Sequence, residues 1–222
     1  MGNQVKILRI KQGLDELSDL LDGLKNCDID DGINQLLANE IMVRLQTIQS
    51  LDRHFRGIQM LIEEAKESQG NPQKSNSNTN VKDETEFKKK LIKMGRLIRM
   101  LNSRIWYSHI KPEKLRQHIN DVKLLRCEKI FQFHSDLAND AVEKKNAMLA
   151  KEQYYHIQHA LKGSGLNSHP RIIELIEQTE FMSLQVTKTI ANKLQQEEKE
   201  AQEASEVEEK TTEPTPDAQA RQ

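Results

Sequence analysis

Apolar side chains recur three and four residues apart along most of this chain, and that spacing restricts the chain to helices that each bury one face. Strand-type alternation of apolar and polar residues is not sustained anywhere in the sequence. We therefore predict an all-α fold. Three stripes support this prediction: Ile7, Ile10, Leu14, Leu17, Leu21 and Leu24; Ile33, Leu37, Ile41, Leu45, Ile48, Leu51, Phe55, Ile58 and Ile62; and Phe87, Leu91, Met94, Ile98, Leu101 and Ile105.

The composition predicts an elongated arrangement of those helices. Charged residues make up 30% of the chain and aromatic residues only 4%, which is a lean supply for a compact core. The first and third stripes have the spacing of coiled-coil seams, so we expect an elongated helical hairpin and coiled-coil bundle. Because long helices with narrow seams are marginal alone, we expect these seams to be buried partly against a protein partner or in a homo-oligomer.

Residues 1–69 are predicted to form a helical hairpin. One helix should run from Val5 to Lys25, and the Asp residues that follow it should cap a second helix that continues to about Gln69. The short connection between the two helices favours antiparallel neighbours. Residues 70–82 lack apolar periodicity and are rich in Asn and Ser, so they are predicted to be a flexible linker.

Residues 83–196 are predicted to form a second helical section that begins with a basic helix. Asp83 and Glu86 have the spacing of a capping box, which should start this helix. The helix should then run to about Ile110, where a Lys-Pro pair interrupts it.

The rest of this section is predicted to contain two more helices. One should extend from Glu113 to Leu161, with a kink where charged residues interrupt its stripe. The next should have Ser168 as its cap and Pro170 in its first turn. Residues 197–222 carry nine acidic residues against three basic ones, and are predicted to form a helix without a buried face that fades into a disordered acidic tail.

The strongest candidate site is the basic stretch on the predicted third helix. Between Phe87 and Lys111 the chain has eight Lys or Arg residues and no acidic residue. An aromatic pair lies near the end of this stretch. The side chains proposed to bind an anion or nucleic acid are Lys88, Lys89, Lys90, Lys93, Arg96, Arg99, Arg104, Trp106 and Tyr107.

The function that these patterns favour is a non-catalytic coiled-coil adaptor or scaffold that acts through protein–protein interaction. The seams would pair with helices of a partner, and the charged segments would select it. The alternative is a nucleic-acid-binding accessory protein that uses residues 87–111, because cations neutralise phosphates and Trp106 and Tyr107 suit stacking on an unpaired base. An isoelectric point near neutrality favours protein docking over a dedicated nucleic-acid binder.

The run from Gln158 to Ser164 gives a further alternative. It reads Gln-His-Ala-Leu-Lys-Gly-Ser and resembles the phosphoacceptor signature of bacterial histidine phosphotransfer domains. The resemblance implies that His159 accepts a phosphoryl group and that Lys162 offsets its charge. The same residues suit a helix C-terminus with Gly163 as its cap.

No metal ligand set, cofactor, small-molecule substrate or enzymatic activity is predicted. Glu152, His156 and His159 share one helix face, but a di-iron bundle would need a second such set, which the sequence lacks. Cys27 and Cys127 are too far apart in sequence for a zinc spacing and too few for a disulfide framework, so both are expected to be buried apolar residues. Without a membrane-spanning run or a signal peptide, the protein is expected to be cytoplasmic and not bound to a membrane.

Overall fold

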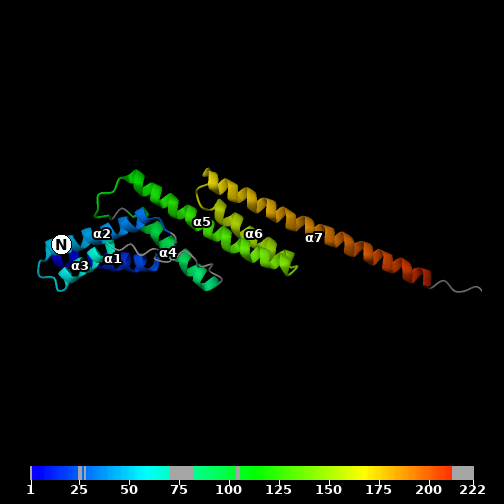
Figure 1. Cartoon of the computed structure of the whole chain (residues 1–222), viewed down its shortest axis with the longest axis horizontal. Coiled ribbons are helices and arrows are strands. Elements are labelled where there is room, and N and C mark those ends of the chain that lie inside the picture. Colours follow the sequence, from blue (N-terminus) through cyan, green and yellow to red (C-terminus); the bar gives the residue numbers. More distant parts are fainter. Residues whose placement is uncertain (1, 25–26, 28, 71–82, 104–105, 212–222) are drawn as a thin grey trace, which may run out of the picture.

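The fold is an elongated array of helices (Figure 1). The computed structural model describes residues 2–24, 27, 29–70, 83–103 and 106–211, and within these ranges it contains seven helices and no strands. The all-α prediction is therefore confirmed. The helices are α1 (Asn3–Leu24), α2 (Asp31–Leu51), α3 (Ile58–Gly70), α4 (Glu84–Asn102), α5 (Pro112–Glu143), α6 (Ala147–Lys162) and α7 (Pro170–Thr211).

Helices α1 and α2 pack as an antiparallel hairpin, with α3 against α2 and α4 against α1 (Figure 1). Their shared core contains most of the first stripe, and Leu20 is buried while Leu21 is half-buried. The chain's own helices thus cover much of the seam that was expected to meet a partner. In the third stripe, the buried residues are Phe87, Met94 and Leu101, the half-buried ones are Leu91 and Ile98, and Ile105 lies outside the described residues.

The prediction of one helix from the Asp residues after the first helix to about Gln69 is wrong, because residues 52–57 separate α2 from α3. The Asp52 side chain accepts a hydrogen bond of 2.9 Å from the backbone N–H of His54, which stabilises a turn. Gly57 then adopts a φ of 81°, a left-handed conformation that suits glycine. The turn brings Ile58 and Ile62 back onto the same core, where both are buried.

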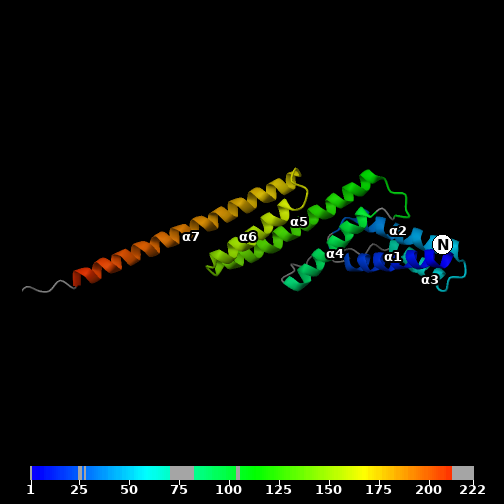
Figure 2. The same ribbon diagram turned by 180° about the vertical axis from the view of Figure 1, so that it is seen from behind.

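The prediction of one kinked helix from Glu113 to Leu161 is also wrong, because the chain reverses fully between α5 and α6 (Figure 2). Lys145 has a φ of 57° in the connection, and the Asn146 side chain accepts a hydrogen bond of 3.1 Å from the backbone N–H of Leu149. Asn146 is therefore the N-cap of α6. The resulting α5–α6 hairpin packs against the first half of α7 around a second core.

Helix α5 joins the two cores. Near its start, Ile119 and Val122 are buried with the residues of α1, α2 and α4. Further along, Cys127, Ala138 and Ala141 are buried with the residues of α6 and α7. The two cores are therefore connected by one continuous helix, which explains the elongated shape of the molecule (Figure 1).

Two helix ends differ from their predicted positions, whereas α7 continues into the segment after residue 196 that was predicted to be helical. The basic helix α4 begins after Asp83 as predicted, but it ends at Asn102 rather than near Ile110. At the start of α7, the imidazole of His169, not Ser168, accepts a hydrogen bond of 3.2 Å from the backbone N–H of Arg171. Helix α7 continues beyond the α5–α6 hairpin to Thr211 (Figure 1).

The remaining predictions on chain organisation fall partly outside the described residues. These include residues 71–82 of the predicted linker and residues 212–222 of the predicted acidic tail.

Cys27 and Cys127 are both buried and unbridged, as expected. Among the described helices, none combines the length and the apolar character that crossing a membrane requires.

Candidate functional site

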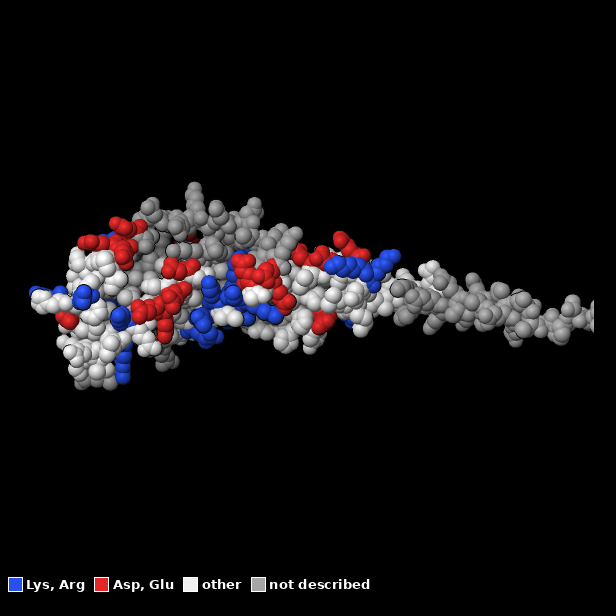
Figure 3. Space-filling model, turned by 90° about the horizontal axis from the view of Figure 1, so that it is seen from below, with Lys and Arg blue, Asp and Glu red and all other residues white. Residues whose placement is uncertain are grey.

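The outward side of α4 presents cations around one apolar side chain. On the opposite side of this helix, Met94 and Leu97 are buried in the first core, and Phe87 is buried against α5. We define the basic face of α4 as the five exposed residues Lys88, Lys89, Ile92, Arg96 and Arg99. Ile92 lies at its centre and is 56% exposed. Figure 3 shows basic residues gathered over the middle of the molecule, with acidic groups on both sides of them.

The structure divides the predicted basic residues into exposed and covered ones. Lys90 and Lys93 are half-buried, and Lys93 lies against α1, where its Nζ is 2.8 Å from the place that a Cβ on Gly23 would occupy. Lys88 pairs with Glu84 at 2.6 Å on the same helix. Arg104 lies outside the described residues.

Three cations of the basic face remain available for a partner. Lys89, Arg96 and Arg99 are all exposed, and in the described part of the chain none of them forms an ion pair. No other described residue therefore neutralises their positive charge through an ion pair.

The predicted stacking pair Trp106 and Tyr107 lies in the connection between α4 and α5. Trp106 is half-buried against the first core. The ring of Tyr107 lies under the guanidinium group of Arg44, with 5.1 Å between the guanidinium carbon and the ring centroid. This cation–π contact occupies one face of the Tyr107 ring, and 37% of the residue remains exposed.

A buried ion pair that the sequence did not reveal holds this connection against α2. Glu40 has no exposed surface, and its carboxylate accepts a hydrogen bond of 2.8 Å from Arg44 Nε. The same carboxylate accepts hydrogen bonds from the backbone N–H groups of Tyr107 and Ser108, at 3.0 and 2.9 Å, and from the Ser108 hydroxyl at 2.6 Å. We call these residues the Glu40 network.

The Glu40 carboxylate is hydrogen-bonded on both oxygens within the protein, and its pKa and the packing around Arg44 both reflect this. Burial raises the pKa of Glu40, but the hydrogen bonds from Ser108, Tyr107 and Arg44 outweigh it and lower that pKa below its ordinary value. A Cβ on Gly13 of α1 would collide with the Arg44 guanidinium group, so glycine leaves room for this side chain. The network therefore fixes α1, α2 and the α4–α5 connection together, and its groups have a structural role.

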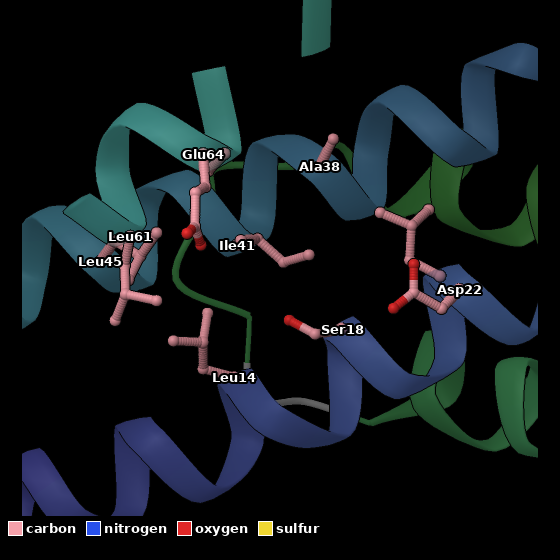
Figure 4. Close-up of a pocket in the computed structure, with 10 residues that line it drawn as sticks. Leu14, Ser18, Asp22, Ala38, Ile41, Leu45, Leu61 and Glu64 are labelled. Carbon is pink, nitrogen blue, oxygen red and sulfur yellow. The ribbon is translucent and has the colours of Figure 1, made fainter. Parts of the chain in front are cut away.

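An open groove lies over α2, between α1 and α3 (Figure 4). Its volume is about 250 Å³. Its apolar surface includes Leu14 of α1, Ile41 and Leu45 of α2, and Leu61 of α3.

The polar groups of the groove are acidic or neutral. The Ser18 hydroxyl and the carboxylates of Asp22 and Glu64 face the space between the helices (Figure 4). No Lys or Arg contributes to the lining in the part of the chain that the structure describes. We call this feature the α1–α3 groove.

The histidine proposed as a phosphoacceptor lies near the C-terminal end of α6. His159 is exposed, and its backbone carbonyl accepts a hydrogen bond of 3.0 Å from the N–H of Gly163, which is the C-cap. The helix ends there and the chain turns into α7. The expected helix C-terminus with Gly163 as its cap is therefore confirmed.

The other polar side chains of α6 lie beside a histidine of α5. His134 Nδ1 is 2.8 Å from Gln153 Oε1, and burial lowers the pKa of His134. His156 Nε2 is 3.8 Å from Glu152 Oε1 on the same helix. No group of three or more His, Cys, Asp or Glu side chains among the described residues has the geometry of a metal site.

Comparison of the chain with protein-family models, with curated proteins and with solved structures gives no significant match. Its function is therefore inferred from its own residues.

Proposed function

We propose that the protein is a non-catalytic helical adaptor that binds a partner protein through the basic face of α4. The exposure of Ile92 among unpaired cations is the observation that supports this proposal. An aliphatic side chain surrounded by charges is the usual composition of a protein contact, in which an apolar centre is buried and a charged rim selects the partner.

The basic face is held in a fixed position by the helices behind it. The Phe87 ring stacks on the Phe133 ring of α5, with 3.9 Å between their centroids and an angle of 10° between their planes. Met94, Leu97 and Leu101 are also buried on the same side of α4. A preorganised surface loses little conformational entropy on binding, which favours recognition.

A second exposed apolar surface lies on α7, in the other half of the molecule. Ile173, Phe181 and Leu184 share one side of this helix at spacings of eight and three residues, and Phe181 is 63% exposed. Figure 1 shows that α7 extends away from α4. Two exposed surfaces at separate places on an elongated body support an adaptor that holds two partners apart.

Nucleic-acid binding is the alternative function, and the unpaired cations Lys89, Arg96 and Arg99 favour it. Two observations favour a protein instead. Arg44 occupies one face of the Tyr107 ring, and the apolar Ile92 lies at the centre of the basic face, where a phosphate-binding surface would place a cation or a hydrogen-bond donor.

A photo-crosslinking experiment in the native cell tests the proposal. The photoreactive residue p-benzoylphenylalanine replaces Ile92, and as a control it replaces Leu8, which is 66% exposed on α1. We expect position 92 to form defined protein adducts that position 8 does not form. The adducts should disappear when Arg96→Glu and Arg99→Glu are added, because these changes reverse the charge of the rim.

Two results would contradict the proposal. Equal adduct patterns at positions 92 and 8 would show that the basic face has no selective partner. Adducts with nucleic acid alone would support the alternative. In that case the affinity should fall with salt, with a log-log slope of about −0.7 to −0.9 for each phosphate contact.

A further inference from the structure

We infer that the partner of the basic face of α4 is the α1–α3 groove of a second copy of this chain. This inference rests on the proposed function, because it names the partner of the same surface. It follows from two complementary features of one molecule: an acidic groove with an apolar floor, and a cationic helix face with an apolar centre.

The groove offers apolar surface and carboxylates to an amphipathic cationic helix. Its volume of about 250 Å³ leaves room for an isoleucine side chain. Leu14, Ile41 and Leu61 supply apolar surface on three different helices. In the described chain the Glu64 carboxylate has no ion-pair partner, and it faces the groove (Figure 4).

The basic face of α4 has the matching arrangement. Ile92 and Arg96 are four residues apart and Arg99 is three residues further, so all three lie on the same side of the helix. Lys89 lies three residues before Ile92 and extends this side. If Ile92 enters the groove, the cations before and after it on α4 lie beside the carboxylates of the groove. The described lining of the groove contains no cation that would repel them.

A helix in this groove would complete a familiar packing arrangement. Helices α1 and α3 both pack against α2, and the groove follows the free side of this layer. A further helix between α1 and α3 would make a four-helix bundle. Ile92 of one copy and the half-buried Leu21 and Leu61 of the other would then lose exposed apolar surface, which favours association.

The occupant must come from another molecule, because α4 cannot turn its basic face toward its own groove. Phe87, Met94 and Leu97 fix the other side of α4 within the chain. The groove and the basic face both belong to the first half of the molecule, where α4 packs against α1. Two copies related by a two-fold axis could therefore insert each α4 into the other's groove, which gives a closed dimer.

Another acidic segment of the sequence is a competing candidate for the basic face. Residues 197–211 of α7 carry seven Glu and two Lys residues. This segment offers charge but few large apolar side chains, whereas the groove offers both charge and a place for Ile92. Sequence composition therefore favours the groove.

The first experiment measures the dimer by sedimentation velocity at about 50 mM salt. We expect the full chain to dimerise at micromolar concentration, and Ile92→Asp to raise the dissociation constant at least about tenfold. Glu64→Lys alone, and Lys89→Glu with Arg96→Glu, should each have a similar effect through like-charge repulsion. Met148→Asp on α6, at a position that is 75% exposed, is the control and should leave the dissociation constant within about twofold.

Mixing the two charge-reversed proteins provides the decisive test. In the mixed dimer, the lysine introduced at position 64 of one chain would face the glutamates introduced on α4 of the other chain. At the second contact, the unmodified Glu64 would face the unmodified cations. Both contacts are then attractive. We expect the equimolar mixture to dimerise although each protein alone does not.

The second experiment identifies the contact itself. Benzoylphenylalanine at position 92 is photolysed in a mixture of unlabelled and 15N-labelled full-length protein, and the linked peptides are identified by mass spectrometry. We expect mixed-isotope links from position 92 to peptides of α1 or α3. Links to residues 197–211 would overturn the inference in favour of the acidic segment.

The remaining outcomes separate this inference from the proposed function. A monomeric full chain at tens of micromolar, or a mixture that stays monomeric, would refute the second copy as the partner. With benzoylphenylalanine placed at position 64 instead, links within one chain to residues 71–82 would show that the groove is filled by the chain itself, and would also refute the second copy as the partner. In either case, selective adducts at position 92 in the cell would still support an adaptor with a different partner.

Discussion

Replacing Glu40 with Gln should destabilise the protein far more than the same replacement at an exposed glutamate. The carboxylate accepts two hydrogen bonds on each oxygen, from Arg44 and Tyr107 on one and from Ser108 on the other. Gln keeps one oxygen and places an NH₂ group against the two donors of the lost one. Each buried donor without an acceptor costs about 1–3 kcal/mol, so we expect a loss of about 3 kcal/mol.

The pH dependence provides a second readout of the same change. The pKa of Glu40 lies below its ordinary value of 4.5 in the folded protein, so the folded state releases this proton more readily than the unfolded state. The stabilisation is therefore complete above about pH 4.5 and is lost as pH falls through the folded-state pKa. Glu40→Gln should remove this part of the acid sensitivity.

The assay is urea unfolding followed by circular dichroism, combined with hydrogen exchange at the backbone N–H groups of Tyr107 and Ser108. The variant should lower the unfolding midpoint and speed exchange at these two groups first. Glu16→Gln, at an exposed position on α1, is the control. The reasoning fails if Glu40→Gln and Glu16→Gln unfold within about 0.5 kcal/mol of each other, because a fully paired buried carboxylate cannot be that dispensable.

Three further predictions follow from local packing. Gly13→Ala should destabilise by about 1–3 kcal/mol because its Cβ meets the buried guanidinium group, whereas Gly95→Ala, where a Cβ meets nothing within 4 Å, should stabilise by about 0.5–1 kcal/mol; thermal melts check both. Phe87→Ala should cost about 3–5 kcal/mol in urea unfolding, because this buried ring is stacked on α5. Burial lowers the pKa of His134 below 6.5, so stability should fall as pH drops below about 6.5, and His134→Gln should flatten the melting temperature between pH 7 and pH 5.

The helical class could be predicted from the sequence, but the two main chain reversals could not. At the break between α2 and α3, the apolar stripe continues through Phe55 and Ile58 because both helices bury their residues in one core. Asp52 and Gly57 favour a turn, but the uninterrupted apolar stripe through this region favours a single helix. Between α5 and α6, the left-handed residue is Lys145, a residue type that gives no warning of a turn.

The Glu40 network shows a second limit of sequence reasoning. Glu40 and Arg44 are four residues apart, a spacing that ordinarily indicates an exposed ion pair on a helix surface. Here the pair is buried because Ser108 and Tyr107, more than sixty residues later, supply its remaining hydrogen bonds. Only tertiary contacts distinguish a structural ion pair from a surface one.

The period of an α-helix is enough to predict which residues of the basic stretch face outward. At 3.6 residues per turn, Ile92, Arg96 and Arg99 point opposite to the seam formed by Phe87, Met94 and Leu101, whereas Lys90 and Lys93 lie on its flanks. Periodicity alone therefore separates the outward cations from those near the core. It cannot show that α1 covers the flank at Lys93, because that depends on Gly23, which leaves room for the lysine stem seventy residues away in the chain. The basic stretch thus forms one outward face with an apolar centre. Because of that apolar centre, a protein surface matches it better than a nucleic acid does.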